Sequence, residues 1–131
     1  MKTCDKHRFY ICKHCGNIIG MIECSGVHVV CCGEEMTLLE PNTSDGAHEK
    51  HVPIVTVEGN KITVKIGSAP HPMLAEHHIS WVYLQTEKGG QRKNLEIGTE
   101  PQVSFLITED DKPLAAYAYC NLHGLWEAPI E

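Results

Sequence analysis

The sequence predicts an all-β protein whose N-terminal part is a small metal-binding domain, and two observations carry this prediction. After residue 50, short β-branched or aromatic runs alternate with turn signals, and no segment keeps a helical period over about 11 residues. Before residue 40, the chain is instead dense in Cys and Gly. Short strands separated by turns favour an antiparallel sandwich or barrel, of which the immunoglobulin-like β-sandwich is the commonest type.

The domain boundary is predicted from a stretch of helix and strand breakers. Residues 40–47 have the sequence EPNTSDGA, which is typical of a connector. We therefore expect a first domain at 1–39, a linker at 40–47 and a second domain at 48–131. The second domain is long enough to build its own core, whereas the first is too short to do so easily.

The strands of the second domain are predicted from alternation and turn chemistry. Gly59 and Asn60 form a turn signal between two β-branched runs, so these runs should form a hairpin in which Ile62, Val64 and Ile66 share one face. Two turn-rich stretches, at 87–90 and 109–113, separate the later runs. The predicted strands span 52–57, 61–66, 78–86, 103–108 and 114–119.

Charge and hydropathy exclude several classes of function. Eleven Lys and Arg against seventeen Asp and Glu give a formal net charge of −6, which argues against a protein that coats nucleic acid or an anionic membrane. No apolar run approaches the ~18 residues of a membrane span, and no charged-then-apolar leader is visible, so a cytoplasmic protein is expected. In a reducing cytosol, seven cysteines and nine histidines favour metal binding over a disulfide framework.

The first candidate metal site consists of cysteines. Cys12 and Cys15 form a C-x2-C turn, and the adjacent pair Cys31-Cys32 can complete a tetrahedral sulfur shell for zinc or a single iron. Gly16 and Gly33 permit the tight turns, although adjacent ligands should distort the tetrahedron. The spacing supports a structural zinc and a redox iron about equally. Cys4 and Cys24 lie outside this pattern and are expected to be free thiols.

The second candidate site combines histidines with one cysteine. His51, His71 and His77 are followed by Cys120-Asn-Leu-His123, and all lie beside loop or strand-edge signals. Histidine and thiolate are ligands for transition metals, so this set is unlike a group of ordinary core histidines. The C-x2-H turn is similar to the ligand loop of blue copper proteins. However, Gly124-Leu-Trp follows without a methionine, which weakens the copper interpretation.

Taken together, these motifs resemble desulfoferrodoxin, the two-iron class of superoxide reductase. The resemblance covers nearly the whole chain in order, and it is carried by these motifs: Cys12-x2-Cys15, Cys31-Cys32-Gly33, Glu49-Lys50-His51-Val-Pro53, His71-Pro-Met, Glu76-His77 and Cys120-Asn-Leu-His123-Gly. It implies a desulforedoxin-like N-terminal domain with iron held by Cys12, Cys15, Cys31 and Cys32. It also implies a β-sandwich domain with a second iron, held by four equatorial histidines, His51, His71, His77 and His123, and by the axial thiolate of Cys120.

The resemblance further implies an activity and partners. The expected reaction is one-electron reduction of superoxide to hydrogen peroxide without release of O2, which detoxifies superoxide in an anaerobe or microaerophile. A rubredoxin-like electron donor and a homodimer are implied in the same way. The alternatives are a non-catalytic iron or copper electron-transfer protein, and a zinc-ribbon interaction module that would leave the histidines unexplained.

Glu49 and Lys50 are predicted to act beside the second iron because they immediately precede His51. In a protein of net charge −6, Lys50 would supply the local positive charge that attracts superoxide. The resemblance adds that the glutamate at this position can occupy the sixth coordination site once the iron is ferric. Without a neighbouring ligand, the same two residues would be read as an exposed ion pair on a solvated loop.

Overall fold

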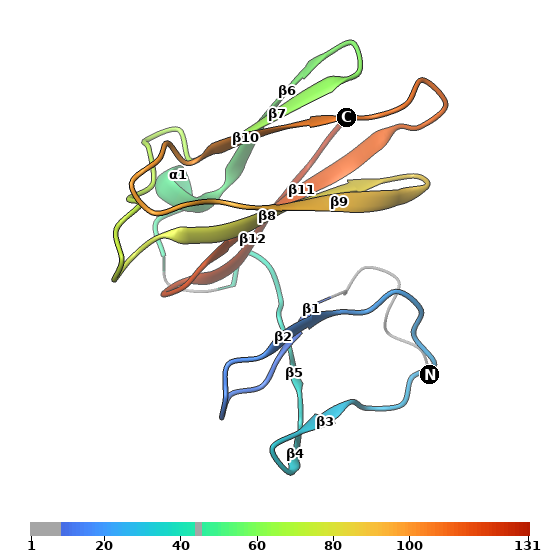
Figure 1. Ribbon diagram of the computed structural model, residues 1–131, viewed down its shortest axis with the longest axis vertical. Helices are drawn as coiled ribbons and strands as arrows, with labels where there is room; N and C mark the ends of the chain where they lie inside the picture. The colour runs from blue at the N-terminus through green and yellow to red at the C-terminus, as the bar shows by residue number, and fades with distance from the viewer. Residues whose placement is uncertain (1–8, 44–45) are drawn as a thin grey trace. The chain divides into compact units, whose positions relative to one another are not determined.

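The computed structural model describes residues 9–43 and 46–131, and the chain divides into two compact units, Met1–Glu40 and Pro41–Glu131 (Figure 1). The first unit contains β1 (Phe9–Ile11), β2 (Ile18–Gly20), β3 (Val30–Cys31), β4 (Glu34–Glu35) and β5 (Thr37–Leu38). The second unit contains α1 (His48–His51), β6 (Pro53–Glu58), β7 (Lys61–Ile66), β8 (Ile79–Thr86), β9 (Gly89–Asn94), β10 (Gln102–Leu106), β11 (Pro113–Cys120) and β12 (Gly124–Pro129).

The first unit is built from very short strands that present cysteines at their ends. β1 is the centre of a three-stranded sheet with the order β2-β1-β5, and β3 pairs with β4 in a separate two-stranded ladder. Among its described residues, the buried apolar side chains are Phe9, Met36 and Cys12. So small a core gives little hydrophobic stabilisation, which is why such units depend on cross-links or metals.

One cross-link corrects an expectation from the sequence. Cys24 is disulfide-bonded, so the prediction of a free thiol at this position is wrong, whereas Cys4 lies outside the described residues. The surroundings of Cys24 give the physical reason. The side chains of Ile22 and Val27 are 94% and 76% exposed. A segment that buries so little apolar surface gains stability from a covalent constraint on its unfolded state.

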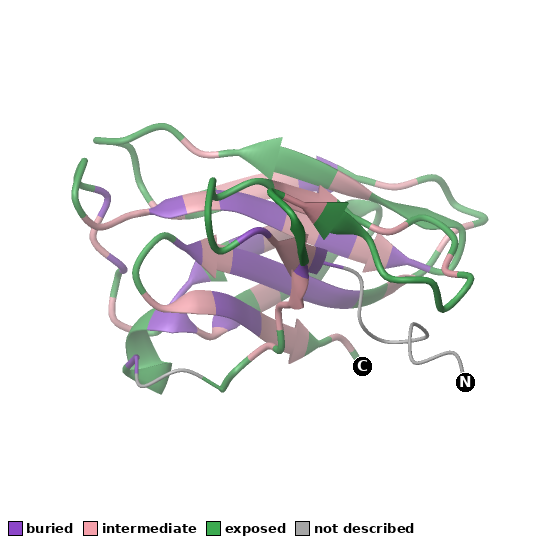
Figure 2. Ribbon diagram, turned by 90° about the horizontal axis from the view of Figure 1, so that it is seen from below, coloured by how far each residue is buried: buried purple, intermediate pink, exposed green. Residues whose placement is uncertain are grey.

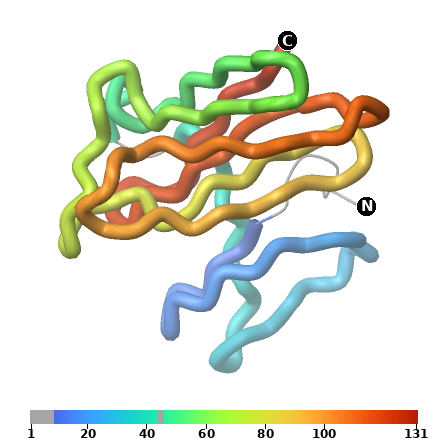
Figure 3. The backbone as a smooth tube through the Cα atoms, turned by 45° about the horizontal axis from the view of Figure 1, so that its top comes forward, coloured from blue at the N-terminus to red at the C-terminus, as the bar shows by residue number. Residues whose placement is uncertain are grey.

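The second unit is an immunoglobulin-like sandwich of antiparallel sheets, as the sequence predicts. One sheet has the strand order β10-β7-β6 and the other the order β12-β11-β8-β9. The two layers can be followed in the backbone trace of Figure 3, and buried stretches are seen on the strands in Figure 2. Ile62, Val64 and Ile66 are fully buried and face Val82 and Leu84 within one cluster, which confirms their predicted common face.

One cysteine belongs to this core and lies beside an irregularity in the strand pairing. On β11, Ala116, Ala118 and Cys120 alternate onto the buried face. The pairing of β11 with β8 slips between Tyr119 and Cys120, so that Cys120 lies opposite Ile79. The sulfur of Cys120 is therefore held at the end of a central strand, in a fully buried position.

Three elements of the second unit were not expected from the sequence. The stretch 87–90 was predicted as a turn, but β9 already begins at Gly89. Neither β12 nor the short helix α1 was predicted. Both β9 and β12 are edge strands of the larger sheet, where pairing on one side is sufficient and apolar alternation is not required.

Candidate metal centres

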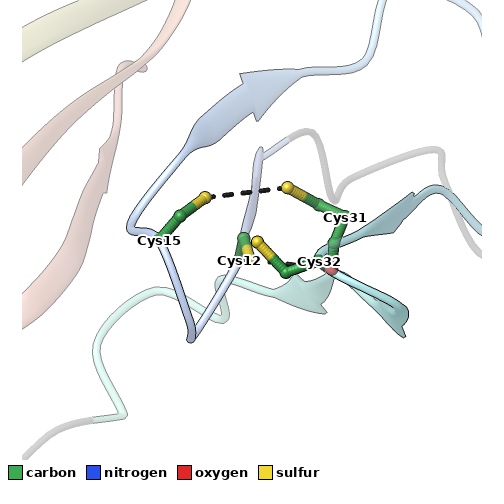
Figure 4. Close-up of side chains that lie close together, drawn as sticks. All are labelled: Cys12, Cys15, Cys31 and Cys32. Carbon is green, nitrogen blue, oxygen red and sulfur yellow. Dashed lines mark hydrogen bonds between the residues drawn. The ribbon is translucent and has the colours of Figure 1, made fainter.

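The four cysteines of the first predicted site converge. Cys12 and Cys15 flank the turn after β1, whereas Cys31 ends β3 and Cys32 follows it. Their sulfur atoms lie within 4.8 Å of one another, and the Cys15 and Cys31 sulfurs are 3.7 Å apart (Figure 4). A tetrahedron with metal–sulfur bonds of about 2.3 Å has sulfur–sulfur edges of about 3.8 Å. The four thiols thus fit a single tetrahedral metal ion.

The adjacency of Cys31 and Cys32 is accommodated by the backbone. Cys32 has φ 53° and Gly33 has φ 77°, so the chain turns through the left-handed region at both residues. Figure 4 shows the two side chains leaving the backbone separately and approaching the C-x2-C pair. The left-handed turn therefore lets the adjacent side chains of Cys31 and Cys32 face the same metal ion. In the pair Cys12 and Cys15, the two intervening residues have this effect.

The electrostatics of the first site match a metal-thiolate centre. Backbone N–H groups, first that of Cys15, lower the pKa of Cys12 to about 6. Hydrogen bonding with Cys12 and Cys15 raises the pKa of Cys32 to about 12. One thiol thus ionises readily while a neighbour keeps its proton, because four thiolates cannot share this space without a cation. Binding of a metal ion would displace the remaining protons.

The second predicted site is assembled at one end of the sandwich. His51 ends α1, His71 and His77 lie between β7 and β8, and Cys120 and His123 flank the turn from β11 to β12. Ligand atoms of His51, His71, His77 and Cys120 lie within 4.8 Å of one another. The Nδ1 atom of His123 is 3.0 Å from Nε2 of His51 and 3.8 Å from Sγ of Cys120.

The imidazoles form a closed ring. The neighbouring centroid distances are 4.6 Å for His51–His71, 4.7 Å for His71–His77, 5.1 Å for His77–His123 and 4.8 Å for His51–His123. The diagonal distance from His51 to His77 is 6.2 Å. Four nitrogen donors around a square, with one buried sulfur close by, match a square-pyramidal ligand set of four histidines and a cysteine.

Hydrogen bonds decide which ring nitrogen faces the centre. Nδ1 of His51 donates to the Ala47 carbonyl over 2.6 Å, and Nδ1 of His71 donates to the Pro72 carbonyl over 2.7 Å. Nε2 of each ring is then left to face inward. The buried Nε2 atoms of His71 and His77 have no hydrogen-bond partner. Such orphaned acceptors cost free energy unless a metal ion occupies the space between them, so the residues fit an iron centre.

Burial keeps these rings neutral. It lowers the pKa of His71 to about 4, and it is also the main cause that lowers the pKa of His51 and His77. Burial raises the pKa of the Cys120 thiol, against hydrogen bonds from the N–H groups of Leu122 and His123. Neutral imidazoles and a thiol that gives up its proton to a cation are suited to metal ligation.

Glu49 and Lys50 lie on α1 with exposed side chains. The carbonyl of Glu49 accepts hydrogen bonds from the Ala69 N–H and the Ser68 hydroxyl, which fixes the backbone of the helix. Burial is the main cause that lowers the pKa of His77, and the charges of His123 and His78 come next. The positive charge of Lys50 lowers this pKa further. Lys50 is thus electrostatically close to the ring of histidines. The predicted roles of both side chains stay predictions.

Two supporting residues were not found from the sequence. The indole N–H of Trp126 donates to the His123 carbonyl over 3.1 Å. The Asn121 amide accepts from the His78 N–H over 2.9 Å and donates to the Glu76 carbonyl over 3.1 Å, so it ties both neighbours of His77 to the Cys120 turn. Asn121 lies within the Cys120-Asn-Leu-His123 motif and Trp126 lies three residues beyond His123, but only the packing shows which backbone groups they reach.

Comparisons with known proteins agree with this geometry. The sequence model of the desulfoferrodoxin family matches residues 43–129. A desulfoferrodoxin homolog from Archaeoglobus fulgidus is 43% identical over 91% of this chain and 94% of its own length.

Solved structures agree as well. The superoxide reductase of Treponema pallidum has a TM-score of 0.79 and 41% identity over 94% of this chain and 98% of its own. A superoxide reductase from Giardia intestinalis, described as 1Fe-SOR, has a TM-score of 0.55 and 34% identity over 63% of this chain and 98% of its own. The extent of the family match and the identity to full-length relatives lead to one conclusion: this chain belongs to the desulfoferrodoxin family.

Proposed function

We propose that this protein is a superoxide reductase that converts superoxide, one electron and two protons into hydrogen peroxide without forming O2. The observation that carries the proposal is the ring of four imidazoles beside the buried sulfur of Cys120. Ferrous iron bound there would supply the electron. The names of the relatives from Treponema pallidum and Giardia intestinalis support the same reaction.

The proposed ligand sets follow from the two clusters. Cys12, Cys15, Cys31 and Cys32 hold the first iron, and His51, His71, His77, His123 and Cys120 hold the second. Four neutral imidazoles and one thiolate offset only a single charge of a divalent ion, so the centre keeps a positive charge that favours an anionic substrate. The thiolate of Cys120 donates electron density to the metal, which favours electron transfer to the substrate.

Lys50 and Glu49 have distinct proposed roles. The ammonium group of Lys50 attracts superoxide and orients it, and its charge is felt at His51 and His77. The carboxylate of Glu49 would serve as a ligand for the oxidised iron, which would help peroxide to leave. The fixed backbone of α1 supports both roles, since it holds these side chains one and two residues from His51.

The proposed domains are a desulforedoxin-like domain at 1–39, a connector at 40–47 and the catalytic domain at 48–131. The first domain is proposed to relay electrons to the iron of the second domain or to support the fold. A small rubredoxin-like carrier is the proposed electron donor. The exposed side chains of Cys15 and Cys32 support this role, because they bring the first iron close to the protein surface.

Two further properties belong to the proposal. The apolar side chains exposed on the first unit, among them Ile22, Val27 and Val30, support a homodimer in which a second copy covers them. The four free thiols of the first site accord with a reducing, cytoplasmic location, whereas the disulfide at Cys24 does not argue for it. In the described residues, no helix is long and apolar enough to cross a membrane.

Pulse radiolysis of the fully reduced protein tests the reaction. We expect each superoxide consumed to oxidise one second-site iron and to yield one peroxide, with no O2. The variant Cys120→Ser should lose this reaction while it keeps the visible absorption of the first iron, which serves as an internal control for folding. Release of O2 would identify a dismutase, unreactive iron would identify an electron carrier, and wild-type rates in Cys120→Ser would exclude the role of the thiolate.

A further inference from the structure

Three described residues before α1, Asn42, Gly46 and Ala47, make close contacts with β12 or with the histidines of the second centre. Asn42 is the anchor: its N–H donates to the Leu125 carbonyl over 3.0 Å, and its side-chain amide donates to the Glu127 carbonyl over 3.1 Å. The amide oxygen of Asn42 also accepts the Glu127 N–H over 2.8 Å. Three hydrogen bonds to one strand hold Asn42 beside β12, which begins directly after His123.

Gly46, four residues after Asn42 in the sequence, lies against two of the histidine rings. Gly46 is buried, and a Cβ atom placed there would lie 2.9 Å from Cβ and 3.0 Å from Cγ of His123. The same atom would lie 3.0 Å from Cε1 of His51. The backbone of Gly46 is outside the left-handed region, so glycine is required at this position for space and not for its conformation.

The next residue completes the contact. The carbonyl of Ala47 accepts Nδ1–H of His51 over 2.6 Å and also accepts the Lys50 N–H over 3.2 Å. This bond selects the His51 tautomer whose Nε2 faces the centre. Gly46 and Ala47 together touch the rings of two of the four proposed histidine ligands.

We infer that Gly46 is a positioning residue of the second metal centre: its missing side chain sets how closely the rings of His51 and His123 approach the metal. The inference rests on the proposed ligand set of the superoxide reductase site. A methyl group at residue 46 would lie too close to Cβ of His123. Because this atom is bonded directly to the backbone, it cannot move away without displacing the turn that also carries Cys120. The two rings must then tilt, and the metal–nitrogen bonds change with them.

The test compares Gly46→Ala with the wild-type protein loaded with iron in both sites. We expect a shifted thiolate-to-iron charge-transfer band for the oxidised second iron, and release of that iron to a chelator accelerated about 10- to 100-fold. The absorption of the first iron and its release rate should not change, because its ligands belong to the other unit. A changed charge-transfer band reports on ligand geometry, which a purely structural role would leave alone.

Gly20→Ala is the matched control. Gly20 also lies outside the left-handed region, and an added Cβ would meet only the Phe9 ring, at 3.4 Å. This variant should keep the wild-type band and release rate of the second iron. Asn42→Ala covers the case in which Gly46→Ala does not fold. It removes the two side-chain hydrogen bonds of Asn42 to the Glu127 backbone without crowding the rings, and it should speed release of the second iron alone.

The outcomes separate this inference from the proposed function. Wild-type bands and release rates in both Gly46→Ala and Asn42→Ala would overturn the inference. If the wild-type protein fails to reduce superoxide but Gly46→Ala still shifts the band, the proposed function fails and the positioning role of Gly46 stands.

Discussion

The indole ring of Trp126 stacks on the imidazole of His51, with ring centroids 4.9 Å apart and planes inclined by 25°. Trp126 is fully buried, and its N–H donates to the His123 carbonyl. One side chain thus holds the ring of one proposed ligand and the backbone of another. It does so from β12, an edge strand of the larger sheet.

The variant Trp126→Phe should separate these two contacts. Phenylalanine keeps a ring against His51 but removes the donor to the His123 carbonyl. Loss of this hydrogen bond costs about 0.5–1.5 kcal/mol, and the smaller ring adds a cavity penalty. We expect urea unfolding to show a destabilised second unit, together with a shifted charge-transfer band of the second iron.

Trp81→Phe provides the comparison for Trp126→Phe. Trp81 is buried in the same sheet and stacks on Tyr119, with centroids 5.7 Å apart. Its replacement removes the same volume, and it should destabilise the unit with the band unchanged. Equal band shifts in the two variants would show that Trp126 acts only through packing.

Lys50→Ala should slow the encounter with superoxide. The exposed ammonium group is a local positive charge near the proposed ligands in a chain of net charge −6. Its loss should lower the second-order rate constant by up to about ten-fold at low salt and flatten the dependence of the rate on ionic strength. Pulse radiolysis over a series of salt concentrations measures both effects.

Lys61→Ala controls for net charge. Lys61 begins β7 at the Gly59–Asn60 turn, whereas Gly67, beyond the other end of β7, packs on the Lys50 carbonyl. The length of the strand places Lys61 roughly 17 Å from that end. An identical loss of rate in the two variants would show that overall charge matters and that the position of Lys50 does not.

The predictability of the fold differs between central and edge strands. The hairpin of β6 and β7 follows from the alternation Ile62, Val64, Ile66, since one face of a central strand must be apolar. β9, with the sequence GGQRKN, carries no apolar side chain, and its pairing partner β8 alone gives it strand geometry. β12 contains Pro129, whose lack of an N–H is tolerated at an edge.

The ligand sets could be predicted because metal ligands are limited to a few residue types. A histidine or cysteine at a strand end is visible in the sequence, whereas the residues that aim it are not. Gly46 lay in a stretch that resembles an ordinary connector, and its role depends on contacts with His51 and His123, which are distant in sequence. The position of Cys120 opposite Ile79 likewise depends on the pairing of β11 with β8.

Cys15→Ser should remove the first iron and leave the second intact. Cys15 is one of four convergent sulfurs, and serine is a poor replacement for a thiolate. We expect loss of the first chromophore, an unchanged charge-transfer band of the second iron, and an unchanged rate of superoxide reduction by the pre-reduced protein. Steady-state turnover with a rubredoxin donor then distinguishes two roles of the first iron. If this iron relays electrons, turnover falls; if it only supports the fold, thermal stability falls instead. Loss of the second band would show that the two centres are not independent.

The iron-free protein should become less stable as the pH falls from about 6.5 to about 4. Burial holds the pKa of His71 at about 4, and it also lowers the pKa of His51 and His77, whereas the unfolded chain has ordinary histidines with a pKa near 6.5. In this window the unfolded state binds protons that the folded state does not. The free energy of unfolding therefore decreases with falling pH, and the contribution of His71 levels off below about pH 4.

Urea unfolding followed by tryptophan fluorescence measures this dependence, because Trp81 and Trp126, the two tryptophans of the chain, both belong to the second unit. His71→Gln removes one titrating group and should reduce the slope of stability against pH. His28→Gln, at an exposed position 3.4 Å from the Glu35 carboxylate in the first unit, should leave the slope unchanged. A slope that is the same in the wild type and in His71→Gln would mean that His71 is not held neutral by burial, and that the orphaned Nε2 is solvated in the iron-free state.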